Sequence, residues 1–120
     1  MASITIPDGL SKLVLYENLN YDFSREQVTV KSGQNLAAGA VVAYDTGKIV
    51  VFQTGTTGDP CGILLFAVNA TSADTQGVMI ARHAIMRTAS LVWDSGESSG
   101  EKTAALVKLA ALGILVRTEV

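Results

Sequence analysis

The chain has very few residues of the types that build redox or metal chemistry. It contains one cysteine, Cys61, one histidine, His83, and two prolines among 120 residues. A single cysteine cannot form a disulfide within the chain, so the fold suits a reducing cytoplasm. One cysteine and one histidine cannot supply the roughly four ligands of a structural metal site. We therefore expect no metal and no other cofactor.

Charge and aromatic residues are also scarce. Charged residues make up 17 % of the chain and aromatic residues 6 %, with a net charge of −2. The nine Lys and Arg residues are scattered from Lys12 to Arg117. Nucleic-acid binding needs clustered cations or a platform of stacking aromatics, so we expect no nucleic-acid partner.

Long apolar runs are missing, although the chain as a whole is apolar. No run approaches the roughly 20 residues that span a bilayer. The N-terminus has neither the basic region nor the apolar core of a secretion signal. We expect no membrane association and synthesis in the cytoplasm. Hydrophobic residues nevertheless make up 48 % of the chain, with a mean hydropathy of +0.34. Such a surplus often lies in a subunit interface, so the composition predicts an oligomer.

Short apolar runs separated by glycine-containing turns dominate what is present. This pattern is typical of a mainly β domain. The run Val78–Met86 reads as a strand with a bend near Arg82 and His83, and Asp45–Lys48 is a tight-turn signal. The other predicted strands cover Val28–Val30, Ile49–Phe52, Gly62–Val68 and Ile114–Arg117. We see no internal repeat and no second domain.

One helix is predicted, over Glu101–Leu112, where alanine and leucine dominate. Ser98 or Ser99 can cap its N-terminus, and Gly113 is suited to end it. A stripe of apolar residues at helical spacing predicts the buried face. This stripe consists of Ala105, Leu106, Leu109 and Leu112.

Residues 1–26 form an extended N-terminal arm, and residues 27–120 form the β-rich domain in this prediction. Ile4 and Ile6 alternate with polar neighbours, and Ser11–Tyr16 is a second apolar run. Two interpretations of the arm remain open. It is either an ordinary first strand of the domain or a segment that adds a strand to the sheet of a neighbouring chain.

Two constellations resemble catalytic or binding sites. The segment Gly96–Thr103 lies between a strand and a helix, as a phosphate-binding loop does, but Glu101 intrudes before Lys102 and the glycine spacing is wrong. A polar loop that caps the helix is the better interpretation. Cys61 and His83 could form a nucleophile and base of a small hydrolase, although a buried structural cysteine explains Cys61 more simply.

From about Gln27 onward, the chain resembles the head decoration proteins of tailed phages, of the lambda protein D type. The resemblance is carried by the hairpin LAAGAVVAYDTGKIVVF, the stretch DPCGILLFAVNAT and the ending LVWDSGESSGEKTAALVKLAALGILV. It implies a small β-clip-like barrel or sandwich with one short helix near the C-terminus. It also implies a non-enzymatic capsid decoration protein, made in the host cytoplasm and seated on the outer surface of the virion.

The resemblance further implies partners, and the apolar residues of the arm and the small-residue stretch Leu36–Val42 predict the contact residues. The protein would bind the major capsid protein as a homotrimer at three-fold sites of the expanded head and stabilise it against DNA pressure. The predicted capsid-binding residues lie in the arm and are Ile4, Ile6, Leu13, Val14, Leu15 and Tyr16. The predicted trimer-interface residues are Leu36, Ala37, Ala40 and Val42. A head–tail connector or tail subunit is the alternative structural role.

Overall fold

The computed structural model describes residues 14–17 and 24–117, and within 15–17 only the backbone. These residues form ten strands, one α-helix and a short 3-10 helix, η1, over Thr88–Ser90. The helix is α3 (Ser99–Ala111). The strands are β1 (Val14–Glu17), β2 (Arg25–Val30), β3 (Gln34–Leu36), β4 (Val41–Asp45), β5 (Lys48–Val51), β6 (Pro60–Leu64), β7 (Val68–Ala70), β8 (Thr75–Ile80), β9 (Ala84–Arg87) and β10 (Ile114–Arg117).

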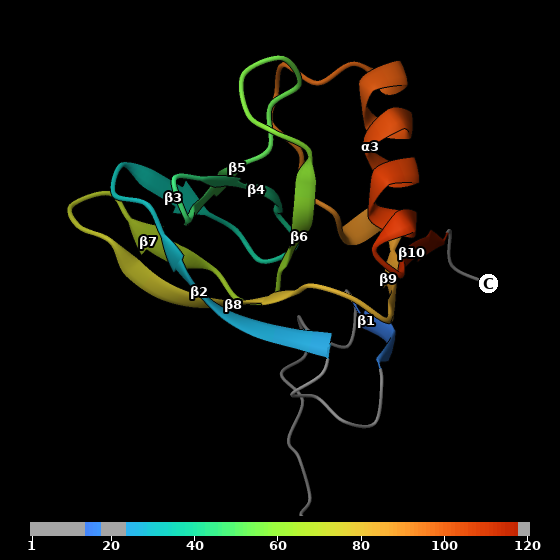
Figure 1. Ribbon diagram of the computed structural model, residues 1–120, viewed down its shortest axis with the longest axis horizontal. Coiled ribbons are helices and arrows are strands. Elements are labelled where there is room, and N and C mark those ends of the chain that lie inside the picture. Colours follow the sequence, from blue (N-terminus) through green and yellow to red (C-terminus); the bar gives the residue numbers. More distant parts are fainter. Residues whose placement is uncertain (1–13, 18–23, 118–120) are drawn as a thin grey trace, which may run out of the picture.

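Five strands close into a barrel in the order β2-β5-β4-β6-β8 (Figure 1). The hairpin β4–β5 turns at Thr46 and Gly47, which both have positive φ, as the turn signal in the sequence predicts. Four of the five strand pairings are antiparallel. The exception is β2 with β5, which is parallel and contains a single register pair, Val30 with Ile49.

Two smaller sheets flank the barrel. In one, β9 lies between β1, which is antiparallel to it, and β10, which is parallel. In the other, β3 pairs with β7. Helix α3 contacts β6 and β10, and Figure 1 shows it standing beside β6 with β9 and β10 near its C-terminal end. The mainly β prediction with one C-terminal helix is confirmed.

The buried residues form two clusters, one inside the barrel and one between the barrel and α3. The cluster inside the barrel includes Val30, Val42, Ile49, Leu64 and Met79. The cluster under the helix includes Val41, Ile63, Leu65, Ile80, Met86, Leu109 and Ile114. Consecutive residues of β4, β6 and β8 thus contribute to opposite clusters, because successive side chains of a strand point to opposite faces.

The bend predicted near Arg82 and His83 is confirmed as the break between β8 and β9. His83 has a φ of 55°, a conformation that non-glycine residues adopt rarely. The break sends the chain from the barrel into the sheet with β1 and β10. The run Gly62–Val68 is also divided, since β6 ends at Leu64 and β7 begins at Val68.

The helix begins and ends as its capping signals predict. The side chain of Ser98 accepts a hydrogen bond from the Glu101 N–H, and the Glu101 carboxylate accepts one from the Ser98 N–H. This capping box satisfies two N–H groups at the N-terminus. Gly113 follows the helix with a φ of 87°.

The predicted helix stripe is correct in three positions and wrong in one. Ala105 and Leu109 are buried, and Leu106 packs against the same cluster. Leu112 is 41 % exposed, because it follows the last helical residue and lies at a surface groove that also contains His83.

Part of the predicted arm forms a strand of this chain's own sheet. Val14–Glu17 pairs with β9 over Ala84–Met86, so the interpretation as an ordinary strand holds for these residues. Ile4, Ile6 and Leu13 lie outside the described residues, and no side-chain contact is described for Leu15 or Tyr16.

Candidate interaction surface

The loop between β3 and β4 holds two small apolar residues, Ala37 and Ala38, at the surface. At one end of the loop, β3 pairs with β7. At the other end, the Gly39 N–H donates to the Leu64 carbonyl at 2.7 Å, and the Leu64 N–H donates to the Ala40 carbonyl at 2.9 Å. The loop is therefore fixed at both ends beside the segment that joins β6 to β7.

The neighbouring segments add larger exposed apolar side chains. Phe66 is 38 % exposed, and Ala67 beside it is also exposed. Val92, which is 41 % exposed, is attached to the same loop. Its N–H donates to the Gly39 carbonyl at 2.9 Å, and its carbonyl accepts from the Val41 N–H at 3.1 Å.

We call these exposed residues the apolar loop surface: Ala37, Ala38, Phe66, Ala67 and Val92. None of them is charged, and three chain segments are joined beneath them by backbone hydrogen bonds. Exposed apolar residues that gather on one part of a protein surface can mark a contact with another protein. A surface held by its own backbone loses little conformational entropy when it binds.

The four residues predicted for a trimer interface differ in their exposure within the single chain. Ala37 is exposed. Leu36 is 7 % exposed, Ala40 2 % and Val42 not at all, because their side chains fill the barrel. Within Leu36–Val42, only Ala37 and Ala38 present side chains to the surface.

Sequence reasoning missed Phe66, Ala67 and Val92 as surface residues. Phe66 and Ala67 follow an unbroken apolar run, and the sequence places them inside one strand with Leu64 and Leu65. The chain instead leaves the barrel after Leu64. No pattern in the sequence indicates this exit, because it depends on where β7 pairs with β3.

Cys61 and His83 line one groove of about 440 Å³ beside the last turn of α3. Burial, with a smaller contribution from the negative charge of Glu26, raises the pKa of the Cys61 thiol to about 12. An activated nucleophile needs the opposite shift, toward thiolate at neutral pH. The structure thus gives no support to the hydrolase interpretation.

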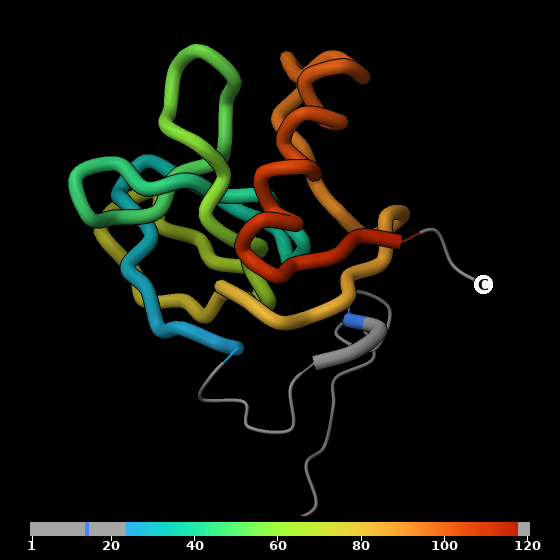
Figure 2. The backbone as a smooth tube through the Cα atoms, turned by 45° about the vertical axis from the view of Figure 1, so that its right-hand side comes forward, coloured from blue at the N-terminus to red at the C-terminus, as the bar shows by residue number. Residues whose placement is uncertain are grey.

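The segment that resembles a phosphate-binding loop has a structural role. Glu101 is engaged in the capping box. The carboxylate of Glu97 accepts from the N–H of Thr54 at 3.0 Å and from its hydroxyl at 2.6 Å. Lys108 of α3 forms an ion pair with Asp59 at 2.8 Å. These contacts hold the loop of residues 53–59 beside the helix, and Figure 2 shows the two at the same end of the molecule.

The described residues contain neither a cluster of metal ligands nor a helix that could cross a membrane. Within residues 14–17 and 24–117, no three His, Cys, Asp or Glu residues cluster as metal ligands would. In the same residues, no helix combines the length and apolar character that a bilayer crossing requires.

The described groups thus define a class of protein. Several polar side chains form caps and ion pairs, the pKa of the Cys61 thiol is raised, and the segments of the apolar loop surface are joined by backbone hydrogen bonds. These features favour a structural role over the hydrolase interpretation.

Comparison with known proteins specifies the class. The family model of the bacteriophage lambda head decoration protein D matches residues 3–114, and the chain therefore belongs to this family. The family is structural and associates with the phage capsid. No curated protein matches the chain significantly.

Proposed function

We propose that the protein binds the expanded phage head as a homotrimer at three-fold sites and stabilises the shell against the pressure of packaged DNA. The observation that carries the proposal is the family match over residues 3–114. The barrel supports it, because a closed and densely packed domain can transmit load between neighbouring capsomers without changing shape.

The trimer contact is assigned to the apolar loop surface. The predicted interface stretch, Leu36–Val42, contributes Ala37 and Ala38 through side chains and supports them with its buried residues. Small residues allow close approach of two backbones, and Phe66 supplies a larger apolar side chain at their edge. Aromatic anchors of this kind contribute strongly to interfaces.

The capsid contact is assigned to the arm, including Ile4, Ile6, Leu13, Val14, Leu15 and Tyr16. β1 lies at one edge of the sheet β1-β9-β10. An edge strand can accept another strand, whose backbone supplies hydrogen bonds while alternate side chains supply specificity. A strand of the major capsid protein is the proposed partner of this arm.

Sedimentation of matched variants tests the trimer contact. Wild-type protein and Ser72→Asp, which adds the same charge to an exposed loop, should sediment as trimers. Phe66→Asp should sediment as a monomer with nearly unchanged secondary structure, because a buried unpaired charge opposes association. Ala40→Asp is unsuitable, because Ala40 is buried in its own chain. A trimeric Phe66→Asp variant would move the interface elsewhere, and rings of six or twelve would indicate a connector.

Head binding is tested by deleting residues 2–13, which leaves β1 in place. The truncated protein should remain a folded trimer yet fail to co-sediment with expanded, undecorated heads. Undiminished binding to heads would place the capsid contact outside the deleted segment. A monomeric truncated protein would show that these residues belong to the trimer contact instead.

A further inference from the structure

The strand pairs that close the barrel differ in length, and the pair β2–β5 is the shortest. Along the pair β2–β5, the only register pair is Val30 with Ile49, and the Lys31 N–H donates to the Ile49 carbonyl at 3.0 Å. Beyond this point β2 turns away into β3, whereas β5 continues to Val51. We call the gap that opens at the end of β5 and along the two residues after it, from Val51 to Gln53, the seam.

The backbone donors of β5 alternate between its two neighbours. The Phe52 N–H faces β4 and donates to the Val41 carbonyl at 2.9 Å. The N–H groups of Val51 and Gln53 therefore face the seam. No strand among residues 14–17 and 24–117 has a register pair with either residue on that side.

Two side chains take the place of the missing strand. The Val51 N–H donates to Oε1 of Gln34 at 3.1 Å, and the Gln53 N–H donates to Oγ1 of Thr57 at 3.1 Å. Gln34 reaches the seam from β3, and Thr57 reaches it from the loop of residues 53–59. The two N–H groups that face the seam thus donate to side-chain oxygens rather than to backbone carbonyls.

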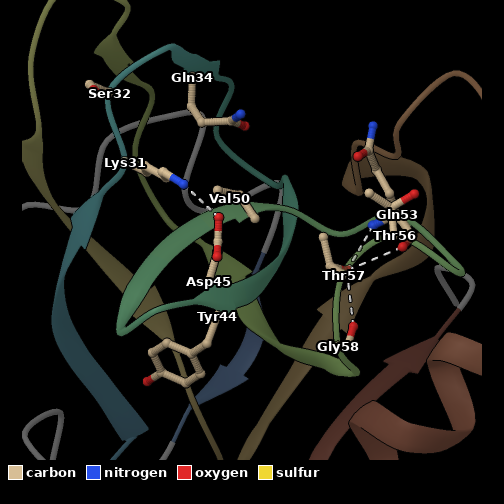
Figure 3. A pocket seen from close by; sticks show the side chains of 10 residues that line it. All are labelled: Lys31, Ser32, Gln34, Tyr44, Asp45, Val50, Gln53, Thr56, Thr57 and Gly58. Atoms are coloured by element: carbon tan, nitrogen blue, oxygen red, sulfur yellow. Dashed lines mark hydrogen bonds and ion pairs between the residues drawn. The ribbon is translucent and has the colours of Figure 1, made fainter.

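The seam lies along a cleft of about 440 Å³ that both side chains line. In Figure 3, Gln34 lines it from one side and Thr57 from the other. The ion pair between Lys31 and Asp45, at 2.7 Å, spans the same cleft. The cleft gives an approaching chain access to β5 if the two side chains move.

We propose that Gln34 and Thr57 are latches that complete the barrel at the seam and keep β5 from pairing with another copy of the chain. An unpaired strand edge is a template for edge-to-edge association. When a side chain accepts a hydrogen bond from each N–H that faces the seam, these N–H groups are not available to pair with an incoming strand. This inference concerns the isolated protein and does not depend on head binding.

Amide hydrogen exchange under native conditions tests the latches one at a time. Gln34→Leu keeps a side chain of similar size but removes the acceptor, so exchange of the Val51 amide should become up to about tenfold faster, as expected for one lost hydrogen bond. Gln34→Glu retains an acceptor and should restore slow exchange. Thr57→Val is isosteric and should accelerate exchange of the Gln53 amide by a similar factor.

Matched controls separate the latches from general effects of added apolar surface. Asn35→Leu and Thr56→Val make comparable changes at exposed neighbouring positions and should leave both amides as slow as in the wild type. In light scattering at equal concentration, Gln34→Leu combined with Thr57→Val should form assemblies larger than the wild type, and the combined controls should not.

Either of two results would overturn the proposal. One is an exchange rate at Val51 and Gln53 that does not differ between latch variants and controls. The other is faster exchange without larger assemblies, which would show that the seam edge does not pair even when it is free. If Gln34→Leu does not fold, the exchange rate of the Gln53 amide in Thr57→Val decides whether the latch slows exchange.

Discussion

The two sides of the barrel differ in how their strands are covered. Near the helix, parts of β4, β6 and β8 are covered on both faces. In β4, for example, Val42 points into the barrel while Val41 and Ala43 lie in the cluster under the helix. On the seam side, β2 and β5 carry polar and charged residues on their outer faces, as Gln27 and Lys48 illustrate. One side of the barrel is thus buried beneath the helix, whereas the outer face of the other side carries polar residues.

This difference explains the apolar composition. A strand covered on both faces reads as an unbroken apolar run, as in Val41–Ala43 and Gly62–Leu65, whereas a strand with one solvated face alternates. The hydropathy surplus, which composition assigns to a subunit interface, is therefore partly consumed inside the single chain. Among the described residues, six large apolar side chains remain exposed, and two of them, Phe66 and Val92, belong to the apolar loop surface.

The largest effect is expected on the covered side, from Leu109→Ala. Leu109 is fully buried between α3 and the barrel, so its truncation should lower the free energy of unfolding by about 2–5 kcal/mol. Val107→Ala on the same helix is the control, because Val107 is 67 % exposed and should change stability by less than about 0.5 kcal/mol. Denaturant melts of both variants measure the contrast. Equal midpoints would mean that the helix does not cover the barrel.

A second change tests how tightly the covered strands approach each other. A Cβ at Gly62 would clash with the Ile80 carbonyl oxygen and lie 2.8 Å from the Met79 sulfur. Gly62→Ala should therefore cost roughly 1–3 kcal/mol, the range typical of overpacking. Gly58→Ala, where a Cβ meets nothing within 4 Å, is the matched control. Equal melting temperatures of Gly62→Ala and Gly58→Ala would contradict the close approach of β6 and β8.

The smallest effect is expected on the seam side and depends on pH. The carboxylate of Asp74 accepts from Nζ of Lys48 at 2.6 Å and from the Ser32 N–H at 2.8 Å. The hydrogen bond from Lys48, followed by that from Ser32, holds the pKa of Asp74 below its usual value. The stabilisation is thus present above the unfolded pKa of the carboxyl and is lost as pH falls through the lower folded pKa.

Asp74→Asn should accordingly unfold more easily than the wild type near neutral pH, and the two should converge in acid. Melts across about pH 6 to 2 at low salt follow the difference, which salt should reduce because Asp74 is exposed. Parallel curves across this range would show that the ion pair contributes nothing to folding.

The sequence by itself determined the elements whose signals are local. The helix follows from its composition, the capping box of Ser98 and Glu101, and Gly113 at its end. The hairpin turn at Gly47 and the break at His83 were equally predictable, because each depends on the backbone preferences of a few adjacent residues.

Only the tertiary structure decided which apolar residues are covered. Ala37 and Ala40 lie in one small-residue stretch, yet one is exposed and the other is buried. Leu109 and Leu112 lie on one predicted stripe, yet only Leu109 is covered. The pairing of β3 with β7 precedes the exposed Ala37, and the end of α3 at Ala111 leaves Leu112 at the surface. Strand pairings join residues far apart in the chain, so the periodicity of a single segment cannot predict them.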